Sequence, residues 1–292
     1  MQDNEYLTKK IAIIAGRGML PKILIENCQK RGQEFLLFLL DCEEYEINYS
    51  NFNPIILPYG SISKILEIIK SNQIKNLVLV GAVNKPNFST IKVDKKGALL
   101  LSKILAKKIL GDNSVLGTVI DFFEKEGLKI LTIDQLLSDI VSKEGVLTKL
   151  APSNYDLENI KIATNAIKTM SCLDIGQSVI MAQKQIIAVE ALEGTDNLIK
   201  RCEQLSAEFK KDAILVKLKK TGQTKKADLP VIGIDTIKNC HNCNIKGIAI
   251  ESGATLIINK QQVIEEADRL GLFIISIKRP KISNFSFLKH CL

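Results

Sequence analysis

The sequence has 292 residues, of which 46% are hydrophobic and 25% are charged, and this globular composition excludes a disordered or collagen-like chain. Lys and Arg number 40 against 32 Asp and Glu, which gives a formal net charge of +8. Arg occurs only at positions 17, 31, 201, 269 and 279, and aromatic residues make up 5% of the chain; because nucleic-acid binding favours arginine forks and aromatic stacking, we expect no nucleic-acid partner.

In the first 135 residues, continuous apolar runs alternate with amphipathic segments. Strands are predicted at 10–15, 35–40, 54–57, 76–80 and 128–133, and helices at 21–31, 62–71, 99–110 and 118–126. Apolar strands that alternate with helices are typical of a parallel sheet with both faces covered. The sequence therefore predicts an α/β domain over residues 1–135.

After this domain the periodicity weakens through Gly145 and Pro152, which predicts a linker over residues 136–153. Residues 154–292 are expected to form a mixed α+β domain. Its helices are predicted at 156–170, 196–207, 232–244 and 261–270, and its strands at 178–182, 185–192, 213–218, 247–251, 255–258 and 272–277. Short turns between neighbouring strands predict two antiparallel hairpins, one at 178–192 and one at 247–258.

No run of the sequence is long and apolar enough to predict a membrane-spanning helix, because a span needs about 20 residues. The first residues are polar and acidic, unlike a signal peptide, so we expect a cytoplasmic protein. The tail 278–292 combines basic residues with Phe285, Phe287 and Leu288. This basic tail is therefore expected to make peripheral contact with an anionic membrane surface.

Cysteines lie at irregular intervals along the chain, which favours reduced thiols over a disulfide framework in a cytoplasmic protein. Cys240-His-Asn-Cys243 is a close pair. A zinc site would need a second pair of ligands, and the only other His in the sequence is His290. A redox pair would stand at the start of a helix, whereas this pair falls late in a predicted helix. We interpret its spacing as coincidental.

The turn Gly16-Arg17-Gly18-Met-Leu-Pro21 joins the first predicted strand to the first predicted helix. Glycines let the backbone approach an anion, and a helix N-terminus presents free N–H groups to it. Asp41 follows the second strand, where dinucleotide sites carry a ribose-binding acid, although Pro21 replaces the third glycine of that fingerprint. The turn indicates a phosphate or nucleotide site, and the alternative is a tight turn without a ligand.

The second half of the chain carries a denser set of polar residues at its predicted turns. They are Glu193, Thr195 and Asp196 after the first hairpin, Lys217 and Lys219 after a strand, and Asp228 before Leu-Pro. Mg²⁺ binds one or two carboxylates together with phosphate oxygens, and lysines neutralise developing negative charge. The set suits hydrolysis of a phosphate ester, while each residue alone is also typical of a cap or a solvated loop.

Several sequence blocks, taken in their order and spacing, resemble the LpxI-type UDP-2,3-diacylglucosamine pyrophosphatases. The blocks are residues 13–21, 111–112, 175–179, 188–196, 228–233 and 247–254. Glu193-Gly-Thr-Asp196 and Asp228-Leu-Pro230 are the most specific of them. The resemblance covers nearly the whole chain and leaves out the tail 278–292.

The resemblance implies a Rossmann-like N-terminal domain, a distinct C-terminal catalytic domain, and a homodimer in which the C-terminal domains are exchanged. It also implies Mg²⁺-dependent attack of water on the α-phosphorus of UDP-2,3-diacylglucosamine. The products are UMP and 2,3-diacylglucosamine 1-phosphate, made during lipid A assembly with transient contact at the inner face of the membrane. By matching blocks, Asp228 is the essential acid, and Glu193, Thr195 and Asp196 line the catalytic pocket. We expect Asp228 to be a metal ligand or the general base, with Glu193 and Asp196 as supporting acids. The expected substrate contacts are Gly16, Arg17, Gly18, Gln177, Thr195, Lys217, Lys219, Gly222 and Gln223.

One block departs from the family pattern. Relatives commonly have Pro-Gly-Gln-Asp followed shortly by Arg, where this chain has Thr221-Gly-Gln-Thr224 and then Lys226. The change removes one candidate metal ligand and replaces a bidentate phosphate fork with a point charge. We expect activity to survive this change.

Two other functions stay open. An NAD(P)-dependent oxidoreductase would use Gly16, Gly18 and Asp41, but the sequence has no recognisable catalytic His, Lys and Tyr set for it. A non-catalytic protein that binds a nucleotide sugar or a membrane surface would use the acidic turns only as helix caps.

Overall fold

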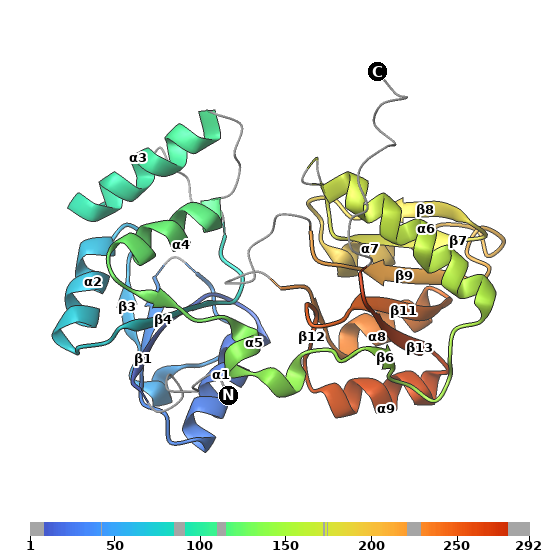
Figure 1. The fold of residues 1–292 in the computed structure, drawn as a ribbon, viewed down its shortest axis with the longest axis horizontal. Helices are drawn as coiled ribbons and strands as arrows, with labels where there is room; N and C mark the ends of the chain where they lie inside the picture. Colours follow the sequence, from blue (N-terminus) through green and yellow to red (C-terminus); the bar gives the residue numbers. More distant parts are fainter. Residues whose placement is uncertain are drawn as a thin grey trace. The chain divides into compact units, whose positions relative to one another are not determined.

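A computed structural model describes residues 9–41, 43–84, 91–109, 115–171, 173, 175–220 and 229–279. The described residues form two compact units, of which the first ends at Asp139 and the second begins at Ile140. Each unit is built around a sheet of its own (Figure 1).

The first unit holds a five-stranded parallel sheet in the order β3-β2-β1-β4-β5. Its strands are β1 (Ile11–Ala15), β2 (Phe35–Leu40), β3 (Ile55–Leu57), β4 (Asn76–Val80) and β5 (Lys129–Ile130). Its helices are α1 (Met19–Lys30), η2 (Ser50–Phe52), α2 (Ile62–Ser71), α3 (Lys95–Ile109), α4 (Val115–Lys125) and α5 (Ile133–Leu136). The helices α2, α3 and α4 share one core with this sheet through Ile65, Leu100 and Ile120. Because connections between parallel strands are right-handed, α1 covers the opposite face.

The second unit holds a six-stranded sheet in the order β6-β13-β11-β9-β7-β8. Its strands are β6 (Gly145–Val146), β7 (Ser178–Ala182), β8 (Gln185–Val189), β9 (Ala213–Lys217), β11 (Ile245–Glu251) and β13 (Phe273–Ile277). β9, β11 and β13 are parallel to one another, whereas β6, β7 and β8 pair antiparallel. A parallel sheet in the first unit and a mixed sheet in the second confirm the predicted fold class.

Helices cover both faces of the second sheet. They are α6 (Asn154–Ser171), α7 (Thr195–Cys202), α8 (Ile234–Asn242) and α9 (Lys260–Leu270). α6 packs through Ile160 and Ile167 against Val179 and Val216, whereas α7, α8 and α9 pack against residues of opposite parity, such as Ile180 and Leu215. Alternate residues of one strand point to opposite faces, so the sheet is buried on both sides.

The prediction of an antiparallel hairpin at 247–258 is wrong. β11 lies between two parallel neighbours, β9 and β13, and β12 (Leu256–Ile257) instead pairs in parallel with β10 (Val231–Ile232) in a separate two-stranded sheet. The Thr255 N–H donates to the Glu251 carbonyl, and the Glu251 N–H donates to the Thr255 hydroxyl, both at 3.1 Å. These bonds turn the chain away from the sheet directly after β11, so no ladder forms between the two strands.

The region around residue 130 also differs from expectation. The strand predicted at 128–133 is limited to β5, because the side-chain oxygen of Gln135 accepts the N–H of Thr132 at 2.9 Å and caps α5. Thr-x-x-Gln is a capping-box signal in the sequence itself.

The segment 136–153, predicted as a linker, contains the short helix η3 (Ser138–Ile140) and the strand β6, which joins the second sheet beside β13.

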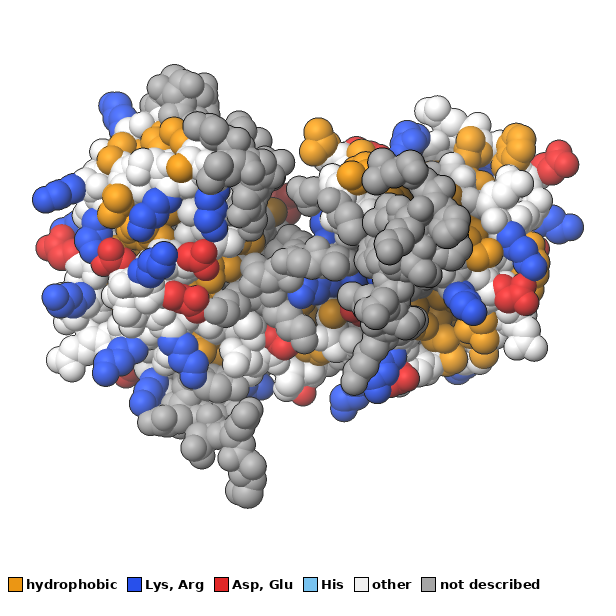
Figure 2. Space-filling view, turned by 45° about the horizontal axis from the view of Figure 1, so that its top comes forward, with side chains coloured by type: hydrophobic (Ala, Val, Ile, Leu, Met, Phe, Trp, Pro, Cys, Tyr) orange, Lys and Arg blue, Asp and Glu red, His pale blue; other side chains and the backbone are white. Residues whose placement is uncertain are grey.

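None of the described helices is long and apolar enough to cross a membrane. On the face seen in Figure 2, Lys and Arg side chains are interspersed with acidic and apolar ones. Pairs such as Lys107 with Asp121 and Lys184 with Glu158 show how lysines are balanced locally by carboxylates. The described residues on that face form no continuous basic stripe of the kind that follows a nucleic-acid backbone.

Four described cysteines, Cys28, Cys202, Cys240 and Cys243, are buried free thiols. Burial raises the pKa of Cys28 to about 11 and raises the pKa of Cys240 well above its ordinary value. Because the thiolate is the reactive form, we expect these four thiols to resist iodoacetamide at neutral pH in the folded protein and to react after denaturation. Peptide mapping by mass spectrometry measures this, with glutathione as the reference thiol; native labelling of Cys240 at the glutathione rate would contradict it.

The N-terminus of α6 is fastened by a buried ion pair. Asp156 is 3% exposed and accepts hydrogen bonds from the Ser153 N–H and hydroxyl at 2.9 and 2.7 Å, and Lys246 Nζ lies 2.8 Å from its other oxygen. We expect Asp156→Asn to lower the free energy of unfolding by about 2 kcal/mol, less than a fully buried pair loses, because Lys246 keeps Asp212 as a partner. Urea denaturation measures this change.

The pH dependence of this effect has a defined sign. Burial raises the pKa of Asp156, but hydrogen bonds from Lys246 and Ser153 outweigh it and hold the pKa below its usual range. The extra stability of the wild type is therefore present above the unfolded pKa, about 3.9, and is lost as the pH falls through the lower folded value. The control, Glu158→Gln, removes an exposed carboxylate from the same helix and should change little; an equal loss in both variants would contradict the prediction.

Candidate functional site

Several predicted site residues of the second unit, including Gln177, Lys217 and Lys219, lie where its three parallel strands end. We call this the carboxyl edge, and Lys217, Glu251 and Ile277 are the last residues of β9, β11 and β13 there. Ser178 at the start of β7 pairs with Lys217, and the Leu218 N–H donates to the Gln177 carbonyl at 2.9 Å. Strand pairing therefore brings Gln177 beside Lys217, although about forty positions separate them in the sequence.

Lys217 is the most informative cation of the carboxyl edge. It is 7% exposed, and its ammonium donates to the Val231 carbonyl at 2.8 Å. Burial of an ammonium is costly unless polar groups or anions surround it. Val231 begins β10, three positions after Asp228 in the sequence. Asp228 itself lies outside the described residues, as do Gly222, Gln223, Thr224 and Lys226.

Thr195 is joined to a buried carboxylate that the sequence does not single out. Its hydroxyl donates to Glu190 Oε2 at 3.0 Å and lies 3.1 Å from the Ser178 hydroxyl. Glu190 is 6% exposed, and its N–H donates to the Ser178 carbonyl. Glu190 follows β8 within the block 188–196, and only its burial distinguishes it from Glu193 in the same block. The structure thus assembles a buried carboxylate and two hydroxyls next to Lys217.

Gln177 is carried by a loop that packs tightly on Glu190. Gly176 has a φ of +38°, and a Cβ there would lie 2.0 Å from the Glu190 carbonyl oxygen. A side chain at position 176 would therefore push the loop away. Gln177 Oε1 is buried and has no hydrogen-bond partner among the described residues, which is unusual for a buried polar atom and leaves it available to a ligand.

Glu193 and Asp196 make their contacts elsewhere. Glu193 lies 2.9 Å from Arg201 Nη2 and accepts the Ala191 N–H at 3.1 Å. Backbone hydrogen bonding and the bond from Arg201 lower the pKa of Glu193, so it is a charged partner of Arg201. Asp196 is exposed in the first turn of α7, 3.5 Å from the Asn239 amide. No described contact connects either carboxylate to Lys217 or Thr195.

Lys219 is held by two residues that the sequence does not predict. Glu251 Oε2 accepts the Lys219 N–H at 2.9 Å and lies 2.7 Å from Arg279 Nη2, which also donates to the Lys219 carbonyl. Arg279 belongs to the basic tail that was expected at a membrane surface, yet here it fastens the segment that leaves β9. The rest of that tail, 280–292, lies outside the described residues.

In the first unit, the predicted glycine turn lies at the point where the strand order reverses. β1 and β4 are neighbours, but the chain proceeds from β1 to β2 on one side and from β4 to β5 on the other. Ligands of parallel α/β sheets bind outside the strand ends at such a point. Arg17 and Ala82 exchange backbone hydrogen bonds there at 2.7 and 3.1 Å.

The two glycines of this turn have different surroundings. A Cβ at Gly16 would lie 2.3 Å from the Ala82 carbonyl oxygen, so this glycine is required by the chain's own backbone. Gly18 has a φ of +91° and precedes α1, and a Cβ there would meet nothing within 4 Å. Open space is therefore found at Gly18, beside the free N–H groups that begin α1.

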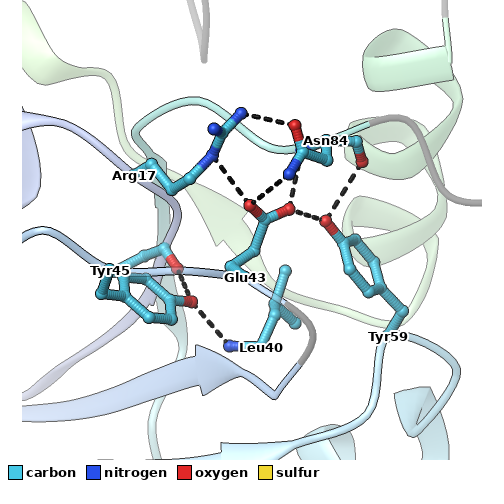
Figure 3. A network of polar contacts seen from close by, with 7 residues as sticks. Arg17, Leu40, Glu43, Tyr45, Tyr59 and Asn84 are labelled. Carbon is cyan, nitrogen blue, oxygen red and sulfur yellow. Dashed lines mark hydrogen bonds and ion pairs between the residues drawn. The ribbon is translucent and has the colours of Figure 1, made fainter.

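Arg17 belongs to a polar network that the sequence does not reveal (Figure 3). Its Nε lies 2.9 Å from Glu43 Oε2, and its Nη2 donates to Asn84 Oδ1 at 2.6 Å. Glu43 also accepts hydrogen bonds from the Asn84 N–H at 2.7 Å and from the Tyr59 hydroxyl. Asp41, the acid suggested by its place after β2, is exposed instead.

Within the described residues, no group of three or more His, Cys, Asp or Glu side chains is arranged to hold a metal ion. The Cys240–Cys243 pair lies in the core beneath α7, where the Cys243 thiol donates to the Ile199 carbonyl. The carboxyl edge, with a buried ammonium, hydroxyls and an unpartnered amide oxygen, is instead suited to a polar anionic ligand.

Two models of one protein family match the chain in succession. The LpxI N-terminal domain matches residues 10–140, and the LpxI C-terminal domain matches residues 143–275. The chain is also similar to UDP-2,3-diacylglucosamine pyrophosphatase LpxI of Caulobacter vibrioides, with 29% identity over 274 residues that cover 92% of this chain and 98% of that protein. The break between the two family models lies close to the division between the two units after Asp139.

Proposed function

The chain belongs to the LpxI family, and from this we propose that it hydrolyses the diphosphate bond of UDP-2,3-diacylglucosamine in lipid A biosynthesis. The family membership agrees with the resemblance carried by the sequence blocks. The structural observation that supports the proposal is the buried ammonium of Lys217 at the carboxyl edge, next to Thr195 and Gln177. A diphosphate is a dianion, and a buried cation is the group that stabilises its developing charge.

The finer chemistry follows from the same residues. Water attacks the α-phosphorus, the bond from this phosphorus to the bridging oxygen breaks, and 2,3-diacylglucosamine 1-phosphate departs with that oxygen, which leaves UMP. Lys217 neutralises charge on the phosphoryl oxygens, Gln177 and Thr195 orient the substrate, and Asp228 accepts the proton of the attacking water. Glu190 holds the Thr195 hydroxyl in place through their 3.0 Å hydrogen bond.

The donor set suits Mg²⁺ when the substrate contributes phosphate oxygens. Mg²⁺ takes only one or two protein carboxylates and fills its remaining positions with phosphate oxygens and water, so Asp228 and, beside Lys217, the buried Glu190 are sufficient. When bound, the ion would withdraw charge from the diphosphate oxygens. Activity should disappear with EDTA and return with added MgCl₂.

The test is hydrolysis of purified UDP-2,3-diacylglucosamine by the full chain in water enriched in ¹⁸O. Release of UMP above the control without enzyme supports the activity, and ¹⁸O in UMP supports attack at the α-phosphorus. Label in the lipid phosphate would move the attack to the other phosphorus. Absence of UMP from folded protein contradicts the proposal, and retention of NAD(P) during purification would favour the oxidoreductase alternative.

The expected assembly and location stay predictions. Analytical ultracentrifugation of the full chain tests the homodimer. Sedimentation with vesicles of anionic and of neutral lipid tests transient contact with the membrane surface, which should weaken as salt is raised.

A further inference from the structure

We propose that Glu43 is a positioning residue, which fixes the guanidinium of Arg17 for a phosphate of the nucleotide-sugar substrate. The inference rests on the proposed function and deepens it, because it concerns how the first unit by itself recognises a phosphate group.

Glu43 is a buried carboxylate with a full set of partners. Its side chain has an exposed fraction of 0%, and an isolated charge so buried would be strongly unfavourable. One oxygen accepts from the Tyr59 hydroxyl and from the Asn84 N–H, and the other accepts from the Asn84 amide at 3.2 Å and pairs with Arg17. These partners come from the turns that follow β1, β3 and β4. The carboxylate therefore ties three loops together at the ends of the parallel strands.

The network restrains Arg17 on one side only. Glu43 forms an ion pair with Nε, which makes no hydrogen bond within the described part of the chain, and Asn84 Oδ1 accepts a hydrogen bond from Nη2. Nη1 has no partner among the described residues, and the side chain is 37% exposed. A guanidinium restrained by one ion pair and one hydrogen bond favours one orientation of its fork, and that fork matches phosphate oxygens. Restraint before binding reduces the entropy lost when the ligand is bound. Arg17 is thus charged, oriented and partly open to a ligand.

The place of the network distinguishes it from a surface ion pair. The side chains of Lys64 and Glu67, on α2, are 55% and 69% exposed and form an ion pair within one helix. The Arg17–Asn84 bond, by contrast, connects the ends of β1 and β4 across the reversal of strand order, beside the open position at Gly18. This is the edge at which parallel α/β sheets bind ligands. A network that served only the fold would not need a half-exposed guanidinium there.

Glu43→Gln is the informative substitution, because it preserves size and removes one acceptor. Each carboxylate oxygen faces two donor groups, so the amide nitrogen of glutamine must face donors whichever way it turns. The orientation of Arg17 is then lost while Arg17 itself stays. The control is Glu44→Gln, which changes the exposed neighbouring glutamate.

The experiment measures kcat and KM for UDP-2,3-diacylglucosamine, together with thermal unfolding, for the wild type, Glu43→Gln, Glu44→Gln, Arg17→Ala and the Arg17→Ala/Glu43→Gln double variant. We expect Glu43→Gln to raise KM about tenfold with little change in kcat, the pattern of lost binding of ground state and transition state alike. Because Glu43 acts through Arg17, the KM of the double variant should lie within about twofold of the KM of Arg17→Ala alone. Glu44→Gln should match the wild type.

A KM unchanged in Glu43→Gln, or an equal rise of KM in both backgrounds, overturns the inference and leaves a loop-fastening role, which lowers the unfolding temperature alone. If Glu43→Gln does not fold, Glu43→Asp keeps the charge with a shorter reach and must give the same dependence on Arg17. Release of UMP by the wild type decides the proposed function separately. If no UMP is released, calorimetric titration of the same proteins with UDP provides the comparison, and equal affinities overturn the inference.

Discussion

Replacing Asp228 with alanine should lower kcat by about three orders of magnitude, within the range that proton transfer and charge stabilisation supply, while substrate binding stays measurable. Asp228 directly precedes a segment that the structure holds firmly. The Leu256 N–H donates to the Pro230 carbonyl at 2.8 Å, and β10 pairs with β12. Lys217 binds the same segment through the Val231 carbonyl. The segment that directly follows Asp228 is therefore held beside Lys217 at the carboxyl edge.

Single-turnover kinetics with Asp228→Ala separate binding from chemistry. Asp228→Asn is the companion variant, because it keeps the shape of the side chain and removes its charge. Asp121→Asn is the control, since Asp121 is 57% exposed on α4 and forms a surface ion pair with Lys107. A rate close to wild type in both Asp228 variants would show that another residue is the essential acid, even if the function is correct.

Lys217→Met should lower kcat by about 100-fold, the effect of removing one well-placed charge donor from a transition state. Methionine has a similar length and tolerates burial, so the core under β9 should remain filled. The variant also leaves the Val231 carbonyl without its donor, which costs about 1 kcal/mol of stability. Initial rates of UMP release measure the first effect and chemical denaturation the second.

The matched control for this variant is Lys211→Met, which removes an exposed lysine close to the start of β9. It should keep the wild-type rate. If Lys217→Met retains that rate while its stability falls, Lys217 only fastens β10, and the charge that neutralises the diphosphate comes from elsewhere.

Much of the first unit is readable from the sequence because its strands are continuous apolar runs. β2, α2 and β4 begin and end at the predicted residues, since each is bounded by polar residues or glycine. The exceptions have local causes. The capping box at Thr132 stops β5 early, and the turn at Thr255 sends the chain out of the sheet after β11.

Only part of the candidate site could be predicted from the sequence in this way. Gln177 and Lys217 are polar residues at strand ends, Thr195 begins α7, and strand pairing brings them together at the carboxyl edge. Glu193 looked equivalent to them in the sequence, but its hydrogen bonds direct it to Arg201. Partners such as Glu43 and Glu190 had no distinguishing signal, because an acidic residue in a loop is usually solvated.

The sequence by itself determined the family, the α/β class and most strands of the two sheets, although it missed β6. It could do so because hydrophobic periodicity and short motifs are local properties of the chain. Only the tertiary structure decided which carboxylates are buried and which cations they hold, as with Glu43 and Arg17 or Glu251 and Arg279. Burial and pairing depend on segments far apart in the sequence, and the same glutamate is a solvated loop residue or a buried anchor according to what folds over it.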